Sequence, residues 1–192
     1  MTDDTEVSDL KIRRYEPTDA TAVQTLHELA FEDVPTDPND IPGTEDLREI
    51  EAAYIDAGGD FLVGVLPTGS DVLEPGRHDR LGEALRVRDG VLVAMGGFLP
   101  ASEGYEDERS IDGAAELHRM RVAPALKRRG YGRKLLGALE SSIRTAGFDP
   151  ILATTAKRQH AAVRFYRSEG YERTEESSSG EYTLIHFQKQ IG

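Results

Sequence analysis

The spacing of apolar residues along the chain predicts alternating strands and helices. Apolar and polar residues alternate over residues 10–15, which predicts a first strand. Nearly every residue of 60–66 and 90–99 is apolar, as in strands that are buried on both faces. Residues 130–146 instead repeat their apolar positions every three or four residues, at Leu135, Leu136, Leu139 and Ile143. This stripe predicts a helix, and Gly147 is a typical helix stop.

The other elements follow from the same reasoning. A helix is predicted to begin at 17–19 with Thr18 or Asp19 as its N-cap, and a second is predicted to begin at Thr44 and to end at Gly58–Gly59. Further predictions are strands at 115–122, 150–155, 171–175 and 182–188 and a helix at 160–169. This order predicts an α/β (α+β) fold around one mixed sheet.

Length and polarity predict a single domain. A chain of 192 residues is long enough for one domain with a real core. Residues 1–9 are predicted to be an acidic tail, and residues 10–192 the domain itself. Segments 67–89 and 100–113 are polar and are predicted to be long loops.

Composition excludes several classes of protein. The chain has no cysteine, which excludes disulfides, a cysteine nucleophile and thiolate metal sites. The longest apolar run is too short to cross a membrane, and the acidic start is unlike a signal peptide. We therefore expect a cytoplasmic protein with no membrane partner. The histidines at 27, 78, 160 and 186 show no metal-ligand spacing, so no metal is expected.

The charge is unevenly distributed. The net charge is −12, and the basic residues comprise 5 lysines and 18 arginines. Such an acidic, lysine-poor chain suggests a halophilic host, because salt screens its self-repulsion; an ordinary acidic enzyme is the alternative. Residues 117–134 hold seven basic residues and no acidic one, so the rest of the chain carries −19. A bound polyanion would explain this basic segment.

The basic segment lies where a strand turns into a helix. Pro124 stops the strand, and Gly130 and Gly132 precede the predicted helix. A helix N-terminus with glycines and arginines is suited to binding phosphate, although a solvated helix start is the alternative. The segment lacks a Walker A pattern, and Leu135 stands where a dinucleotide-binding fingerprint needs its third glycine.

Two motifs resemble those of the GNAT superfamily of acyl-CoA-dependent N-acetyltransferases. The signature [Gln/Arg]-x-x-Gly-x-[Gly/Ala] falls on residues 127–132, with Lys127 at its first position. A second signature, Asn-x-x-Ala-x-x-x-Tyr-x-x-x-Gly-[Phe/Tyr], falls on residues 159–171, with Gln159 in place of asparagine. The resemblance covers residues 10–190 and is strongest over 115–172.

The resemblance implies a single GNAT-like domain with a twisted mixed sheet, a V-shaped opening in the sheet and about four flanking helices. It implies coenzyme A in that opening, with acetyl-CoA as co-substrate. The implied cofactor-binding residues are Met120, Arg121, Val122, Lys127, Arg128, Arg129, Gly130, Tyr131, Gly132, Arg133, Gln159 and Tyr166.

The resemblance also implies the reaction, which is direct attack of a primary amine on the thioester in a ternary complex. Tyr166 is the implied catalytic acid that protonates the leaving thiolate. Glu116 and His118 are candidate bases because they alternate on one face of the strand that leads to the site; a salt bridge from Glu116 to Arg119 or Arg121 is the alternative. Phe165, Tyr171 and Leu117 are expected to be core residues.

Other functions remain open at this point. The main alternative is a non-catalytic acyl-CoA-binding or regulatory module. Nucleic acid is not an expected partner, because the basic segment has few aromatic residues and the remaining charge repels phosphates. The acceptor is expected to be an amine on a small molecule, a protein or a peptide. A monomer or a homodimer is expected, with the strand at 182–188 available to pair with a second chain.

Overall fold

The computed structural model describes residues 9–32, 44–73 and 79–192 of the chain. The predicted acidic tail, apart from Asp9, lies outside the described residues, and so does the proline-rich segment 33–43.

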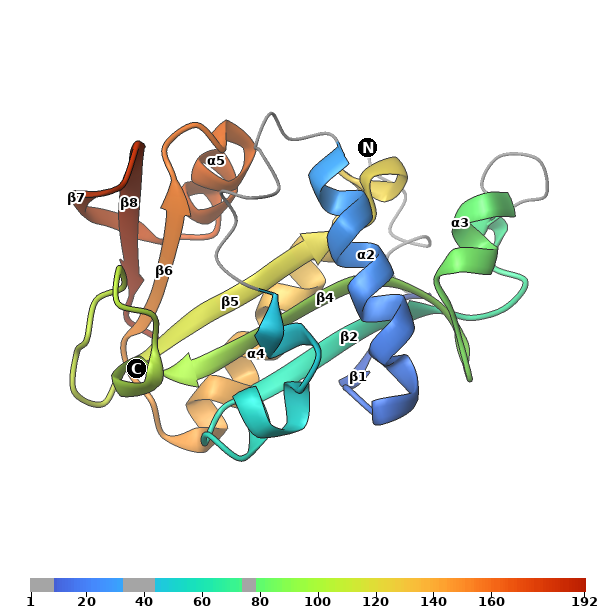
Figure 1. Cartoon of the computed structure of the whole chain (residues 1–192), viewed down its shortest axis with the longest axis horizontal. Coiled ribbons are helices and arrows are strands. Elements are labelled where there is room, and N and C mark those ends of the chain that lie inside the picture. The colour runs from blue at the N-terminus through green and yellow to red at the C-terminus, as the bar shows by residue number, and fades with distance from the viewer. Residues whose placement is uncertain (1–8, 33–43, 74–78) are drawn as a thin grey trace.

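One mixed sheet organises the described chain (Figure 1). Its strands run in the order β1-β2-β4-β5-β6-β8-β7, and β3 pairs with β4 off this path. Only β5 and β6 are parallel; all other neighbours are antiparallel. The strands are β1 (Lys11–Arg14), β2 (Asp60–Leu66), β3 (Arg86–Val87), β4 (Gly90–Pro100), β5 (Ala115–Val122), β6 (Ile151–Ala156), β7 (Glu172–Ser179) and β8 (Tyr182–Lys189).

Helices cover both faces of this sheet. Figure 1 shows α2 in front of β4 and β5, and α4 behind them. The α-helices are α2 (Ala20–Glu32), α3 (Asp79–Ala84), α4 (Tyr131–Ala146) and α5 (His160–Ser168). Short helical turns are η1 (Pro17–Asp19), η3 (Glu45–Leu47), η4 (Glu51–Ile55), η5 (Asp71–Leu73), η6 (Ala101–Glu103) and η7 (Pro124–Leu126).

The sheet separates two hydrophobic cores. On the α2 face, Leu26, Tyr54 and Met95 are wholly buried in one cluster. On the α4 face, Leu135, Leu139 and Ile143 are wholly buried in another. The predicted apolar stripe of 130–146 is thus confirmed as the buried face of α4, and Gly147 caps that helix with a left-handed φ of 87°. β4, predicted to be buried on both faces, is confirmed as a central strand.

The sheet opens between its two parallel strands. β5 and β6 pair only at Ala115↔Ile151, Glu116↔Leu152 and Leu117↔Ala153. Beyond Leu117 and Ala153 the strands continue, to Val122 and Ala156, without pairing with each other. This divergence is the expected V-shaped opening, and it leaves backbone groups on the inner edges of both strands available to a ligand.

The structure departs from the sequence predictions in five places. The N-cap of the first helical segment is Glu16 rather than Thr18 or Asp19, because the Asp19 carboxylate accepts the Glu16 N–H at 2.9 Å. The second helix forms only as the turns η3 and η4, although Leu47, Ile50 and Tyr54 are buried as its apolar stripe predicted.

The third difference concerns segment 67–89, predicted to be a long polar loop, which contains η5, α3 and β3. In the same way, η6 lies in the predicted loop 100–113. The expectation that the strand at 182–188 is free to pair with a second chain is wrong, because β8 is already paired on both sides and β7 lies at the edge of the sheet.

Candidate functional site

The opening between β5 and β6 leads into a cleft of about 1020 Å³. Its walls come from β5, the turn after it, the start of α4, the end of β6 and α5. Phe31 of α2, the segment 105–108 and residues near the β7–β8 hairpin complete them. Of the predicted cofactor-binding residues, the following line the cleft: Met120, Arg121, Val122, Lys127, Arg128, Gly130, Tyr131, Gly132, Arg133, Gln159 and Tyr166. Arg129 does not line it.

One end of the cleft, called here the turn end, consists of residues 127–133. Arg128 and Gly130 both have left-handed backbone angles, with φ of 66° and 84°, and they bend the chain into α4. The first hydrogen bond of α4 runs from the Lys134 N–H to the Gly130 carbonyl at 3.0 Å. The first turn of a helix leaves its N–H groups without intrahelical partners, and the helix dipole makes this end positive. The turn end therefore suits an anion.

The glycine at 132 has a different explanation from the glycine at 130. Residue 130 has a left-handed φ, which residues other than glycine adopt only with strain. A Cβ at Gly132 would lie 3.6 Å from Val122 and 3.7 Å from Phe165, which are ordinary contacts. The fold therefore tolerates a small side chain at 132, whereas a glycine there leaves the helix N-terminus open to a ligand.

Basic side chains gather around the turn end. Lys127, Arg128 and Arg133 line the cleft, and Arg133 pairs at 2.9 Å with Glu169, which follows the last residue of α5. The sequence analysis missed Arg158 and Arg164, which line the cleft from the other side. Their position beside or within the second motif, 159–171, was the signal that could have found them.

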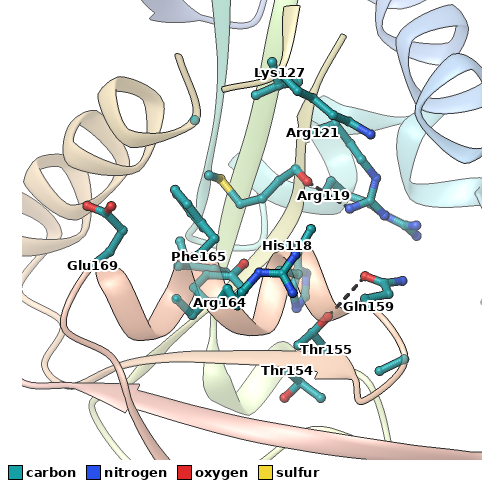
Figure 2. Close-up of a pocket in the computed structure, with 18 of the residues that line it drawn as sticks. His118, Arg119, Arg121, Lys127, Thr154, Thr155, Gln159, Arg164, Phe165 and Glu169 are labelled. Atoms are coloured by element: carbon teal, nitrogen blue, oxygen red, sulfur yellow. Dashed lines mark hydrogen bonds between the residues drawn. The ribbon is translucent and has the colours of Figure 1, made fainter. Parts of the chain in front are cut away.

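Tyr166 lies on α5, packs in the core on the α4 face and lines the cleft. The residue is 7% exposed and packs on Tyr171 and Phe187, with ring centroids 5.4 and 5.7 Å away. Its hydroxyl has no hydrogen-bond partner within the described part of the chain, and burial raises the pKa of Tyr166 above its ordinary value. A protonated phenol at the wall of a cleft is suited to donating a proton. Phe165, expected in the core, also lines the cleft (Figure 2).

The opposite end, called here the histidine end, surrounds His118. The Nε2 atom of His118 lies 2.9 Å from the Glu108 carboxylate, and the Tyr105 ring stacks on the imidazole at 5.0 Å. His118 is only 5% exposed, but it and Glu108 both line the cleft. A histidine held by a carboxylate has a fixed ring orientation and is a suitable proton acceptor.

Arg119 fixes the wall of the histidine end. Its guanidinium forms two hydrogen bonds of 2.8 Å with Asp46, which also accepts the Tyr54 hydroxyl at 2.7 Å. Burial acts to raise the pKa of Asp46, but Arg119 more than offsets it and holds that pKa below its ordinary value.

The acidic segments 33–49 and 100–112, which contain Asp46 and Glu108, were predicted either to border the acceptor side, where carboxylates attract a cationic amine, or to be solvated loops. The contacts of Asp46, Tyr105 and Glu108 themselves were not predicted, because no local pattern in the sequence connects these residues with residue 118.

Glu116 is enclosed beneath the cleft. It is 1% exposed, does not line the cleft, and neither of its carboxylate oxygens has a hydrogen-bond partner within the described residues. The suggested salt bridge to Arg119 or Arg121 is therefore not formed. Burial, followed by the nearby Glu108 charge, raises the pKa of Glu116 well above its ordinary value.

Gln159 lies at the N-terminus of α5. Its side-chain carbonyl accepts the Thr155 hydroxyl at 3.1 Å, which joins α5 to the end of β6 (Figure 2). Leu117 and Tyr171 are buried as expected. Among the described residues, no group of three or more potential ligands could hold a metal ion, and no helix there is long and apolar enough to span a membrane.

Comparisons with known proteins agree with this geometry. Residues 48–171, more than half of the chain, match the model of the acetyltransferase (GNAT) family. No sequence among the curated proteins matches the chain.

Several solved structures share the fold. A GNAT-family acetyltransferase from Staphylococcus aureus is 15% identical, with a TM-score of 0.67 over 95% of this chain and 99% of that one. A putative acetyltransferase from Salmonella typhimurium, solved with its cofactor acetyl-CoA, is 21% identical, with a TM-score of 0.64 over 96% and 95%. The ribosomal-protein-S18-alanine N-acetyltransferase from Escherichia coli is 15% identical, with a TM-score of 0.61 over 95% and 94%.

Proposed function

Because the chain belongs to the acetyltransferase (GNAT) family, we propose that it moves an acetyl group from acetyl-CoA to a primary amine, within a ternary complex. The observation that carries this proposal is the parting of β5 and β6 beyond Leu117, directly in front of the N-terminus of α4. One cleft thereby offers unpaired strand edges to an extended chain and a positive helix end to phosphates.

In this proposal the turn end holds the pyrophosphate of acetyl-CoA. The first turn of α4 supplies N–H donors, and Lys127, Arg128 and Arg133 supply positive charge. The pantetheine arm lies along the backbone of 120–122 as an added strand. Gln159 and Tyr166 face it from α5. Arg129 remains a predicted contact, although it lies outside the lining of the cleft.

The reaction needs a base, an acid and no covalent enzyme intermediate. The amine nitrogen, once neutral, attacks the thioester carbonyl carbon and forms a C–N bond. The tetrahedral intermediate loses the second proton of its positively charged nitrogen to solvent and collapses, breaking the C–S bond; the thiolate leaves, and Tyr166 later regains from solvent the proton that it gives to the thiolate. Tyr166 donates its proton to that thiolate. Burial raises the pKa of Tyr166, which keeps the phenol protonated before the reaction but also makes it a weaker acid.

His118 is the better-placed base of the two candidates. It lines the cleft and is held at 2.9 Å by Glu108, whereas Glu116 is enclosed. Nε2 of His118 faces Glu108, whereas Nδ1 is buried and has no partner among the described residues. The proton of the incoming ammonium therefore goes through a water molecule to Nδ1, and Glu108 stabilises the resulting imidazolium. Glu116 as the base stays a prediction, and its raised pKa favours the protonated form, which accepts no proton.

A binding experiment tests the cofactor part of this proposal. Gly132→Glu places a carboxylate at the start of α4, where the fold has room for a side chain but a phosphate would be repelled. Gly137→Glu makes the same change on the same helix, at an exposed position where a Cβ would meet nothing within 4 Å. We expect the first variant to weaken acetyl-CoA binding about 100-fold or more, because the expected charge-assisted contacts turn repulsive, and the second to leave it unchanged.

Calorimetry in high-salt buffer measures both affinities. If both variants bind acetyl-CoA with equal affinity, and circular dichroism shows that they are folded, acetyl-CoA does not bind at the turn end. Binding of acetyl-CoA without release of free coenzyme A in the presence of any amine would favour the alternative, a non-catalytic acyl-CoA-binding module.

A further inference from the structure

Arg121 is a cation in the cleft with no acidic partner among the described residues. One of its guanidinium nitrogens donates to the Met120 carbonyl at 2.9 Å, and the group lies 4.8 Å from the centre of the Phe31 ring. Arg119, two residues earlier, is instead neutralised by Asp46 through two hydrogen bonds. The two arginines therefore differ in role. Arg119 stabilises the wall of the histidine end, whereas the guanidinium of Arg121 keeps N–H donors that can bind a ligand.

A bulge in β5 sets the direction of Arg121. Met95 pairs with Arg121 and Gly97 with His118, so Arg119 and Met120 together lie opposite Gly96. Arg119 has a left-handed φ of 55°, as in a bulged strand. Met120 then packs over Gly96 on the α4 side, and Arg121 extends to Phe31 on the α2 side. A bulge of this kind re-aims a side chain, here into the histidine end of the cleft.

The partial burial of Arg121 makes its charge costly. Burial, and then the nearby charge of Arg119, lower the pKa of Arg121 to about 10, so it is still a cation at neutral pH. A buried charge is stabilised when an opposite charge and hydrogen bonds satisfy it. In a cleft that takes up substrates, the missing anion is expected on a ligand, and an arginine fork matches a carboxylate with two hydrogen bonds.

Arg121 lies away from the helix-start part of the proposed phosphate site, although Lys127 is beside it (Figure 2). In Figure 2, Arg121 lies on the opposite side of the view from Phe165 and Glu169, and Glu169 is the partner of Arg133 at the start of α4. Arg121 also acts electrostatically on the Tyr166 hydroxyl, the group assigned to the leaving thiolate. Arg121 is therefore near the reacting end of acetyl-CoA, where the acceptor enters.

We propose that Arg121 binds a carboxylate of the acceptor, and that the acceptor is a free amino acid or a similar small molecule with an amine close to a carboxylate. This inference rests on the proposed function. The carboxylate lies on Arg121, over Phe31, and the amine is directed towards the thioester with His118 and Glu108 beside it. A peptide N-terminus or a polyamine offers an amine but no neighbouring carboxylate, and would leave Arg121 buried without an anion.

Matched acceptors test this inference. We would compare the common L-amino acids with their carboxamides, which keep the amine and lose the carboxylate, by following release of free coenzyme A. We expect at least one amino acid to be acetylated with a kcat/KM about 100-fold above that of its amide, because the amide cannot neutralise Arg121. Arg121→Met should remove this preference, and its affinity for acetyl-CoA is measured alongside, because the backbone of residue 121 belongs to the proposed pantetheine site. Arg86→Met, at an exposed position on β3, is the matched control and should keep the preference.

The outcomes separate the two proposals. A variant Arg121→Met that binds acetyl-CoA more weakly, with an unchanged ratio of acid to amide, would assign Arg121 to the cofactor and overturn the inference. Faster acetylation of peptides, polyamines or amides than of every amino acid would also overturn it. If no amino acid is acetylated or raises the melting temperature of the coenzyme A-saturated protein, the inference fails while the proposed function stands on acetyl-CoA binding. Failure of the wild type to bind acetyl-CoA would instead remove the proposed function.

Discussion

At the turn end of the cleft, residues 127–133 follow one another in the sequence, whereas the histidine end combines residues from η3, the segment 105–108, α2 and β5. The turn end works through its backbone, since a left-handed Gly130 and the first turn of α4 present N–H groups. The histidine end works through side chains that hold one another, as Asp46 holds Arg119 and Glu108 holds His118. The first suits a ligand part that is the same in every acyl-CoA, and the second suits a particular acceptor.

The largest expected difference between the two ends is in stability. The Arg119–Asp46 pair is nearly enclosed, with side chains 7% and 12% exposed, whereas Arg133 of the Arg133–Glu169 pair is 70% exposed. Arg119→Met leaves Asp46 buried without its cation and should lower the free energy of unfolding by about 3–5 kcal/mol. Arg133→Met should lower it by less than about 1 kcal/mol. Urea denaturation of both variants measures the contrast, and similar losses would mean that the two ends are not built differently.

This contrast explains how much of the site was predictable. The turn end could be predicted because a stop at Pro124, two glycines and a helical stripe lie within one short stretch. The fold could be predicted in its second half for the same reason: α4, β6 and α5 carry clear local periodicity, and their bounds agree with the structure to within a residue or two.

The histidine end could not be predicted because its contacts span long stretches of sequence. Asp46 and Arg119 are 73 residues apart, and no rule of spacing joins them. The bulge at Arg119 could not be predicted from the sequence either. A glycine often indicates a left-handed φ, but an arginine with that φ gives no such signal. Glu116 and His118 do precede the bulge on one face as predicted, but only His118 lines the cleft.

The second largest effect is expected on the rate of the reaction, when Tyr166, which lines the same cleft, is changed. Tyr166→Phe keeps the ring that packs on Tyr171 and Phe187 and removes only a hydroxyl that makes no hydrogen bond among the described residues. We expect kcat to fall about 100-fold, because the thiolate must then leave without a proton donor. The affinity for acetyl-CoA and the melting temperature should stay unchanged, which calorimetry and thermal unfolding would show. Unchanged turnover would remove Tyr166 from the mechanism and leave the thiolate to be protonated by another group or by water.

The smallest effect concerns His27 of α2, whose ring contacts Phe31 at the wall of the cleft. His27 is 5% exposed, contacts the Phe31 ring at 4.8 Å, and neither ring nitrogen has a hydrogen-bond partner among the described residues. Burial, and then the charges of Arg121 and Arg119, lower the pKa of His27 to about 4. In the unfolded chain that pKa returns to its ordinary value of about 6.5.

The sign of the pH dependence follows from this lowered pKa. Above pH 6.5 His27 is neutral in both states, so its contribution to stability is complete. Between about pH 6.5 and 4 the unfolded chain takes up a proton that the folded protein does not, and the free energy of unfolding falls by about 2 kcal/mol. Replacing His27 with leucine, which has a similar volume and no titrating group, should remove this part of the decline. Urea denaturation at pH 7, 5.5 and 4.5 gives the difference between the two proteins at each pH. If the difference in unfolding free energy between the two proteins were the same at every pH, His27 would take up its proton in the folded state as it does in the unfolded chain. The charges of Arg121 and Arg119 would then be neutralised more completely than the contacts of Arg121 indicate.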